Sequence, residues 1–355
     1  MHRWELMRVA LISPPFIEVP PVRYGGTELF IANLANELHD LGHDVTVYAN
    51  GDSNVRCRLK YLYAHSEWPL ADSFRPWLKN VDHTAWAMAD ASTWADVIHL
   101  NDVVGVPFTR FIDTPTVLTI HHPDEPALSE QYARYPNVHY VAIAEWLARR
   151  QPMPCVHVVH HGIDPDRYTY SADKDDYVAF LGRMAPSKGP HLAILAAKHA
   201  GVRLKLAGEI QPMFRDYWTK QVLPLVDGDQ IEFIGEVDRA AKNRLLSKAR
   251  ALLFPIQWEE PFGLVMIESL ACGTPILALA GGAVQEIVRD GANGWICRDV
   301  DDMAARIKDL DIPPADCRDY MMEQFSLTRM AEQYVSVYDA ARSASVEPVA
   351  SIREA

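Results

Sequence analysis

The sequence predicts an α/β fold made of two parallel-sheet domains, and three observations support this prediction. Short apolar runs rich in β-branched residues alternate with amphipathic helical stretches along most of the chain, which is typical of successive β-α-β units. A polar stretch near Asp164 interrupts the alternation. The chain also has 355 residues with 49% hydrophobic content, which is enough for two cores. We therefore expect two Rossmann-like domains that face each other across a cleft.

The first half predicts the strands and the opening helix of an N-terminal domain. Five apolar runs are expected to be strands: Arg8–Ile12, Val45–Ala49, Val97–Leu100, Thr116–Ile120 and Tyr140–Ala144. Between the first two strands, the periodicity predicts a helix from about Thr27 to His39. It stops before Gly42, because glycine readily takes the positive φ found after a helix.

The segment GIDPDRYTYSADKDD is polar, contains Pro165 and has neither helical nor strand periodicity. We place the domain boundary there, so that residues 1–165 form the N-terminal domain and residues 166–326 the C-terminal domain. Five strands are predicted in the second half: Tyr177–Leu181, Leu204–Ala207, Ile231–Ile234, Ala251–Ile256 and Ile276–Leu279. The predicted helices are Lys188–His199, Pro212–Val226, Arg239–Lys248, Pro261–Ala271, Val284–Arg289 and a final amphipathic helix over Leu327–Ala344.

Composition excludes several classes of partner. The 34 basic and 47 acidic residues give a net charge of -13, which disfavours nucleic acid and anionic bilayers as partners. The five cysteines form no C-x-x-C pair, so neither a zinc site nor a disulfide framework is indicated, and a cytoplasmic location is expected. The N-terminus does not resemble a signal peptide, and no run of ~18 apolar residues predicts membrane insertion.

Two cations flank the first strand-to-helix connection of the second half, FLGRMAPSKGPHL. Arg183 lies at the carboxyl end of the predicted strand and Lys188 in the first turn of the following helix. Cations at a helix N-terminus oppose the macrodipole, so their convergence favours a bound anion such as a phosphate group. The alternative is that both are solvated or paired with Asp175 and Asp176.

The loop SPPFIEVPPVRYGGTELF is long for a connection between a strand and a helix. Gly25 and Gly26 precede the helix, so the backbone can approach a ligand closely there, although a plain N-terminal turn is the simpler explanation. His121 and His122 end a buried strand. His121 is either an active-site group or a satisfied structural histidine, and metal binding is disfavoured because no third ligand accompanies the pair.

Two acids stand eight positions apart in WEEPFGLVMIESLACGTP. Glu260, followed by Pro261, has the position of a residue that caps a helix start. Glu268 lies inside an apolar helical stretch, where an unpaired carboxylate would cost several kcal/mol, so it needs hydrogen-bond donors. A sugar diol could supply two donors, and an arginine of a neighbouring helix is the alternative.

Together these motifs resemble family 4 of the retaining glycosyltransferases, enzymes of the GT-B fold. The resemblance rests on the E-x7-E segment EPFGLVMIE with its continuation SLACGTPILALAGGAVQEIVRDGANG, and on GRMAPSKG, YGGTE and HHGID. It covers nearly the whole chain in the right order. One departure is Gln285, where members often have proline, and it bears on local helix geometry. The resemblance also implies that the final helix, about 327–345, crosses back to the N-terminal domain.

The resemblance implies that these residues hold a nucleotide diphosphate sugar. Arg183 and Lys188 would bind the diphosphate, which the backbone of Gly25 and Gly26 would approach. Glu260 would accept hydrogen bonds from the donor sugar, Glu268 would hold the ribose hydroxyls, and His121 would lie near the 6-hydroxyl of the transferred sugar. Further donor contacts are implied for the amides of Phe262, Gly263 and Leu264 and for the base-binding loop with Gly235 and Val237.

The implied reaction moves a hexose to a hydroxyl of a soluble small molecule or glycan by same-face attack, without a metal or a further cofactor. A UDP-sugar is the favoured donor and a GDP-sugar the alternative. The loop from Ser13 to Tyr24 and the aromatic region from Leu59 to Thr93 would hold the acceptor. Alternatives are a nucleotide-sugar epimerase or a phosphorylase of the same fold, or a nucleotide-sugar binding protein without activity. A nicotinamide oxidoreductase is disfavoured because G-x-G-x-x-G is missing.

Overall fold

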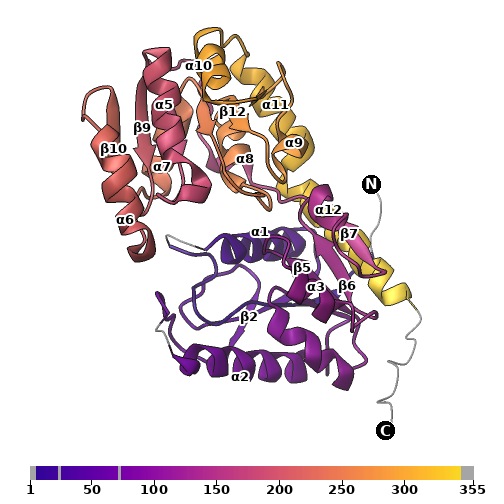
Figure 1. Cartoon of the computed structure of the whole chain (residues 1–355). Coiled ribbons are helices and arrows are strands. Elements are labelled where there is room, and N and C mark those ends of the chain that lie inside the picture. Colours follow the sequence, from indigo (N-terminus) through magenta and orange to yellow (C-terminus); the bar gives the residue numbers. More distant parts are fainter. Residues whose placement is uncertain (1–4, 23–24, 71–72, 345–355) are drawn as a thin grey trace. The chain divides into compact units, whose positions relative to one another are not determined.

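The computed structural model describes residues 5–22, 25–70 and 73–344. The chain divides into two compact α/β units (Figure 1). Unit 1 comprises the described residues up to Gly162 together with those from Leu327 onward, and unit 2 is Ile163–Ser326. Arg23 and Tyr24 of the predicted acceptor loop lie outside the described residues, as does position 345 at the predicted end of the final helix.

Unit 1 is built on a parallel sheet of seven strands in the order β3-β2-β1-β4-β5-β6-β7. The strands are β1 (Arg8–Ile12), β2 (Asp44–Ala49), β3 (Arg58–Tyr61), β4 (Val97–Leu100), β5 (Thr116–Ile120), β6 (His139–Ala142) and β7 (Val156–Val158). The five predicted strands are present. The two strands that were not predicted, β3 and β7, are the edge strands, and neither contains a fully buried residue, so no apolar run identifies them.

Helices cover both faces of this sheet (Figure 1). The helices α1 (Gly26–Asp40) and α12 (Leu327–Ser343) share one core with alternate residues of the strands, among them Val9, Leu11 and Val47. The helix α2 (Phe74–Ala91) lies on the other face, where its Asp90 accepts a hydrogen bond from Tyr48 of β2. Shorter segments complete the unit: the 3-10 helix η1 (Val103–Phe111), α3 (Pro126–Tyr132) and α4 (Glu145–Ala148).

The final helix α12 is tied to the middle of the first sheet by buried polar groups. Tyr338 OH lies 2.8 Å from Nδ1 of His99, whose Nε2 lies 2.7 Å from Thr119 Oγ1. Tyr334 OH lies 2.8 Å from the same threonine oxygen. The helix that ends the described chain is therefore part of unit 1, although it follows unit 2 in sequence.

Unit 2 has a parallel sheet of six strands in the order β10-β9-β8-β11-β12-β13. The strands are β8 (Tyr177–Leu181), β9 (Arg203–Ala207), β10 (Ile231–Gly235), β11 (Leu252–Phe254), β12 (Ile276–Leu279) and β13 (Gly294–Cys297). Its longer helices are α5 (Pro190–Ala200), α7 (Arg239–Lys248), α8 (Leu264–Ala271), α10 (Val300–Lys308) and α11 (Pro314–Phe325). The edge strand β13 and the helices α10 and α11 were not predicted.

Three helix predictions in unit 2 are wrong in detail. The stretch predicted as one helix over Pro212–Val226 is divided into short 3-10, α and π turns, because Pro224 cannot lie inside a regular helix. The helices predicted to begin at Lys188 and Pro261 begin only at Pro190 and Leu264. In both cases a glycine with positive φ immediately precedes the helix, at +68° and +82° respectively.

The strand orders share one property that matters for function. In each sheet the chain starts in the middle, builds outward to one edge, and then returns to build outward to the other. The direction changes between β1 and β4 in unit 1 and between β8 and β11 in unit 2. Ligands of open α/β sheets bind outside the carboxyl ends of the strands at this switch point.

Candidate active site

In unit 2, the loops that follow β8 and β11 pack directly against each other at the switch point. The amide of Gln257 donates a hydrogen bond to the carbonyl of Ser187, at 2.7 Å. A Cβ atom at Gly189 would lie only 2.1 Å from the carbonyl oxygen of Pro255, so only glycine permits this approach. The first loop carries Arg183 and Lys188, and the second carries Glu260.

Lys188, Glu260 and Trp258 form one contact group. The Lys188 ammonium makes an ion pair with Oε2 of Glu260, and the Trp258 indole N–H donates to the same oxygen at 2.9 Å. The ammonium also lies 4.6 Å from the centre of the Trp258 ring. The side chains of Lys188 and Glu260 are only 15% and 8% exposed, so the ion pair is held in a largely water-excluded position.

The structure places Glu260 and Lys188 differently from the simplest predictions made from the sequence. Glu260 is not a cap, because α8 starts four residues later and its carboxylate is directed to Lys188 and Trp258. Lys188 lies in the 3-10 turn before α5 and not in the first turn of that helix. Both donors to Glu260 bind Oε2, and no described residue donates to Oε1, which is left as an acceptor.

Arg183 lies two residues beyond β8 and is partly buried. In the described chain its guanidinium has one hydrogen-bond partner, the amide oxygen of Gln211 at 3.5 Å. The alternative pairing with Asp175 or Asp176 is not present, since Asp176 pairs instead with Arg250. A guanidinium without an acidic partner is therefore available to an anion at the switch point.

Glu268 has the donors that its burial requires. Its side chain is 5% exposed, and Oε1 accepts hydrogen bonds from Tyr168 OH at 2.9 Å and from the ammonium of Lys242 on α7. The ionic partner is thus a lysine of a neighbouring helix and not the arginine considered from sequence. Burial, followed by the charge of Glu268, raises the pKa of Tyr168, which keeps this hydroxyl protonated as a donor. No described residue donates to Oε2.

The remaining predicted donor contacts lie in two loops of unit 2. Gly263 caps α8, so the amides around it belong to the helix start, where N–H groups have no partner within the helix. Gly235 ends β10, and its carbonyl accepts from the amide of Gly208 at 2.8 Å. Val237 is half-buried against a small apolar cluster that includes Leu245.

His121 directly follows β5 in unit 1, within an aromatic cluster. Its ring centre lies 4.9 Å from that of Phe30 on α1 and 5.7 Å from that of His161, to which it is nearly parallel. Burial, together with the neighbouring histidines, lowers the pKa of His121 well below its ordinary value. The imidazole is therefore neutral, and His122 points elsewhere, to Tyr132 OH at 2.8 Å.

The proton of His121 can be assigned from its partner. Asn101 follows β4, and its Nδ2 donates to the carbonyl of Ile12 at 3.1 Å, so its Oδ1 faces Nε2 of His121 at 3.0 Å. An amide oxygen only accepts, so Nε2 carries the proton and Nδ1 is left with a lone pair. The residues thus present a neutral acceptor nitrogen, which suits recognition of a hydroxyl group.

The two glycines before α1 have different surroundings. Gly25 has a φ of +143°, and a Cβ atom there would lie 2.7 Å from Oε2 of Glu28 and 2.9 Å from Pro21. Gly26 is the first residue of α1, and a Cβ atom there would meet no atom of the described residues within 4 Å. Burial, with Glu18 nearby, raises the pKa of Glu28 to about 7. The fold therefore requires glycine at position 25, whereas the described surroundings of position 26 would accept a side chain.

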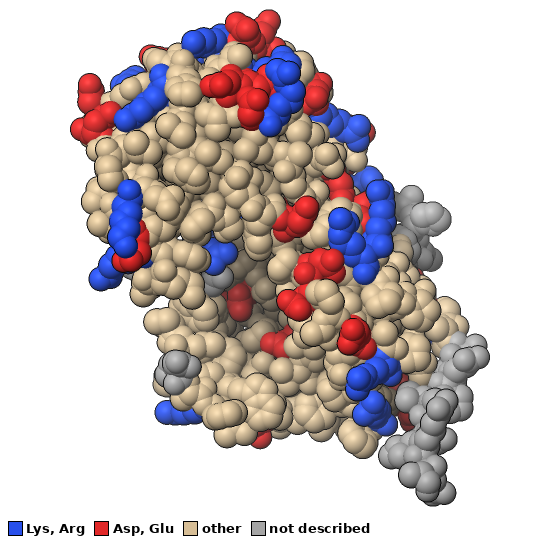
Figure 2. All heavy atoms as spheres, viewed as in Figure 1, with Lys and Arg blue, Asp and Glu red and all other residues tan. Residues whose placement is uncertain are grey.

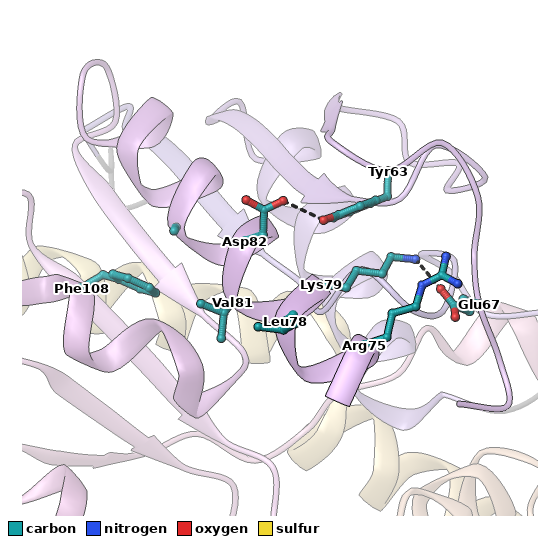
Figure 3. Close-up of a pocket in the computed structure, with 9 residues that line it drawn as sticks. Tyr63, Glu67, Arg75, Leu78, Lys79, Val81, Asp82 and Phe108 are labelled. Atoms are coloured by element: carbon teal, nitrogen blue, oxygen red, sulfur yellow. Dashed lines mark hydrogen bonds and ion pairs between the residues drawn. The ribbon is translucent and has the colours of Figure 1, made fainter. Parts of the chain in front are cut away.

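A second concave site lies beside α2 in unit 1 (Figure 3). It has a volume of about 610 Å³. Its lining comes from the segment after β3, from the first three turns of α2 and from η1. This is part of the aromatic region expected to bind the acceptor. Tyr63 lines the pocket, whereas the pocket lining does not include Trp86, which packs against Tyr48.

Sequence reasoning missed four residues of these sites: Tyr168, Lys242, Trp258 and Asn101. Tyr168 and Lys242 are separated from Glu268 by 100 and 26 positions, so only the fold brings them together. Trp258 stands two residues before Glu260, and Asn101 immediately follows a predicted strand. For Trp258 and Asn101, a side chain that can form hydrogen bonds just after a predicted strand was a signal from which a site residue could have been predicted.

Surface properties add two observations. Acidic and basic side chains are interspersed on the face shown in Figure 2, which has no continuous basic field. None of the helices in the described parts of the chain is both long and apolar enough to cross a bilayer.

Comparison with known proteins finds two glycosyltransferase models, one for each half of the chain. The model described as Glycosyltransferase Family 4 matches residues 24–167, and the one described as Glycosyl transferases group 1 matches residues 166–318. Glycogen synthase of Mycobacterium tuberculosis is 26% identical over 96% of this chain and 97% of that protein. D-inositol 3-phosphate glycosyltransferase of Mycolicibacterium smegmatis is 31% identical, over 53% of this chain and 48% of that protein.

Solved structures show the same fold. Sucrose-phosphate synthase of Thermosynechococcus elongatus superimposes with a TM-score of 0.78 at 21% identity, over 96% of this chain and 100% of that one. An Anabaena protein solved with UDP and glucose gives a TM-score of 0.74 at 16% identity, over 94% and 100% of the two chains. With two parallel-sheet units and the two family matches, the chain is a glycosyltransferase of the GT-B fold.

Proposed function

We propose that this glycosyltransferase transfers a hexose from a nucleotide diphosphate sugar, with UDP-glucose as the favoured donor, to an acceptor hydroxyl with retention of configuration. The observation that carries the proposal is the ion pair of Lys188 with Glu260 at the switch point of unit 2, on the loop that also carries Arg183. One guanidinium and one ammonium beside a carboxylate match a diphosphate joined to a polyhydroxylated ring. An Anabaena protein of similar fold was solved with UDP and glucose and with UDP-glucose, which supports this donor.

Each residue then has a definite task. Arg183 and Lys188 offset the charge that develops on the leaving diphosphate, and Glu260 accepts hydrogen bonds from sugar hydroxyls through its open Oε1. Glu268 accepts from the ribose through Oε2, while Tyr168 and Lys242 hold its other oxygen. Amides of Phe262, Gly263 and Leu264 contact the sugar and phosphate.

The proposed reaction needs no nucleophile from the enzyme. The bond between the anomeric carbon and the diphosphate oxygen breaks, and a bond to the acceptor oxygen forms on the same face. The acceptor proton passes to the leaving phosphate. Catalysis therefore depends chiefly on electrostatic stabilisation of that phosphate. Arg183 and Lys188 supply this charge from the protein, so the proposal includes no metal and no further cofactor.

Acceptor-free hydrolysis tests the donor and the stereochemistry together. UDP-glucose is incubated with the enzyme, and the released glucose is followed by proton NMR before its anomers interconvert. We expect α-glucose to appear first. Initial β-glucose would show inversion and overturn the proposed mechanism. A parallel panel of UDP-, GDP- and ADP-sugars, scored by protection against thermal unfolding, identifies the donor, because a ligand of the native state raises its stability.

A nucleotide-sugar binding protein without activity is the second candidate. Its distinguishing result would be thermal protection by a nucleotide sugar without release of nucleotide at any acceptor concentration. The pairing of Lys188 with Glu260 in a water-excluded position favours the enzyme, because buried charges of this kind are costly to keep without a role.

A further inference from the structure

The pocket beside α2 has two chemically different sides (Figure 3). On one side, Tyr63 OH donates to Asp82 at 2.7 Å, and the Lys79 ammonium donates to Glu67 at 3.1 Å. Lys79 also lies 4.8 Å from the centre of the Tyr63 ring and is only 10% exposed, so this polar side is held in place. The other side is apolar and consists of Leu78, Val81 and Phe108.

The apolar side continues onto the surface of α2. Phe74, Trp77 and Leu78 are 83%, 58% and 57% exposed, and they follow one another at helical spacing. Figure 2 shows that uncharged side chains predominate along the lower edge of the view, with a basic group at the lower left. Exposed apolar side chains that lie next to one another on a protein surface are typical of a binding surface.

The charge of the polar side limits what it can recognise. Lys79 and Arg75 are balanced by Glu67 and Asp82, so the pocket carries no net charge. The carboxylates have spare acceptor positions, and the ammonium has spare protons. Such a set binds neutral hydroxyl groups and does not favour a strongly ionic head group.

Location and size agree with a small-molecule site. Tyr63 and Glu67 follow β3, Phe108 follows β4, and the first turns of α2 lie between them in sequence. The pocket is thus formed by segments at the carboxyl edge of the sheet in unit 1. Its volume of about 610 Å³ falls within the range of roughly 300–1,000 Å³ that is usual for ligand pockets.

We propose that this pocket binds the sugar acceptor, and that the acceptor is an amphipathic small molecule with a hydroxylated, uncharged head and an alkyl or aryl part. The head occupies the polar side with Tyr63, Lys79 and Asp82. The apolar part lies against Leu78 and Phe108 and extends toward Trp77. This inference rests on the proposed function. A simple sugar would leave the apolar side uncovered, and a bilayer would not enter the polar side.

Two glucosides that share a head group test the proposal by direct titration without a donor. The probes are octyl β-glucoside, kept below its micelle-forming concentration, and methyl β-glucoside. We expect the octyl compound to bind at least ~10-fold more tightly, the scale for apolar groups that enter a hydrophobic pocket. Leu78→Ser should remove this difference without changing the affinity for methyl glucoside. Leu223→Ser is the matched control, because Leu223 is 46% exposed and lies in unit 2.

Equal affinities of the two glucosides would overturn the proposal, as would loss of the difference in Leu223→Ser. Co-sedimentation with phosphatidylcholine vesicles that disappears in Leu78→Ser would assign the surface to a membrane instead. A separate titration with UDP keeps the two conclusions apart. If UDP binds and the octyl preference is missing, only the acceptor inference fails. If UDP does not bind, the proposed donor site fails, whereas the glucoside result still stands.

Discussion

The switch points of the two units carry contrasting chemistry. In unit 2 the site is ionic: Arg183 is available to an anion, and Lys188 and Glu260 form a shielded ion pair. In unit 1, Asn101 follows β4 at the switch point, and it fixes the proton of His121, a neutral histidine surrounded by rings at the end of the neighbouring strand β5. The same strand order thus supports one site suited to phosphate charge and one suited to an uncharged hydroxyl group.

The contrast follows from what each loop is packed against. The loops after β8 and β11 meet at Gly189, and Lys188 of the first loop is paired with Glu260 of the second. His121 lies instead against Phe30 and His161, where burial disfavours the imidazolium. Stabilisation of the negative charge on the leaving diphosphate is therefore expected to depend on the cations of unit 2 alone.

The largest expected effect is on the ionic side. Lys188→Ala should lower turnover at least ~100-fold, because a charge that stabilises the leaving phosphate is lost. Lys198→Ala is the control: Lys198 lies on the adjoining helix α5 and makes a partly exposed pair with Asp227, at 4.0 Å. Initial rates at saturating donor measure the effect. Near-normal turnover of Lys188→Ala would remove the ammonium from the chemistry.

The glycine pair before α1 gives the next test. Gly26→Ala should fold with an unchanged melting temperature, since the added methyl group meets no atom of the described residues, yet lose at least ~10-fold in kcat/KM, because the family resemblance implies that the diphosphate approaches this backbone. Gly25→Ala should instead lower the melting temperature, because its φ and its contact with Glu28 exclude a side chain. Full activity of Gly26→Ala would show that the donor does not approach this backbone.

On the neutral side, Asn101→Asp should change the pH dependence more than the maximum rate. A carboxylate beside Nε2 favours the imidazolium, so it raises the pKa of His121. Protonation then removes the lone pair of Nδ1, and activity should fall about 10-fold as the pH is lowered to about 5.5, with recovery at higher pH. Wild type should lack this acid limb. Superimposable pH–rate profiles would show that His121 does not act as an acceptor.

The stability of the fold at acid pH tests whether the buried histidines of unit 1 are neutral, here through His99, and the expected effect is smaller. Burial lowers the pKa of His99 to about 3, so between pH 6.5 and this value the unfolded chain binds a proton that the folded chain does not. Stability is therefore complete above pH 6.5 and decreases as the pH falls, by about 1.4 kcal/mol per pH unit for this group. Thermal unfolding of wild type and His99→Gln between pH 5 and 7 should show a weaker pH dependence in the variant.

Chelation should have the smallest effect of all. Because Arg183 and Lys188 are proposed to supply the charge that a divalent ion supplies elsewhere, activity in EDTA should equal activity in added Mg²⁺. Initial rates under the two conditions give the comparison. Strict dependence of activity on Mg²⁺ would contradict the proposal that Arg183 and Lys188 supply this charge.

The fold was largely predictable because its central strands are buried on both faces. Strands such as β4 and β5 are continuous apolar runs, and these were placed correctly. The edge strands β3, β7 and β13 were missed because they are only partly buried. The helix α2 was missed because exposed Phe74, Trp77 and Leu78 obscure its amphipathic pattern.

The site was predictable in its motif residues and not in their partners. Arg183, Lys188, Glu260 and Glu268 stand within short, ordered motifs that carry the family resemblance. Their hydrogen-bond partners depend on which loops meet in three dimensions, as the distance of 100 positions between Tyr168 and Glu268 shows. Glycine at position 189 sets how closely two such loops approach, and this contact is visible only in the structure.

The most direct test of the donor site is a titration of UDP into wild type, Glu268→Gln and Glu260→Gln. Glu268 is assigned to the ribose, so its substitution should weaken UDP binding about 10- to 100-fold, the range for hydrogen bonds to a charged group. Glu260 is assigned to the transferred hexose, which UDP lacks, and its substitution removes a negative charge beside Lys188, so Glu260→Gln should bind UDP at least as tightly as wild type while its transfer rate falls. Equal UDP affinities of all three proteins would contradict the assignment of the two acids.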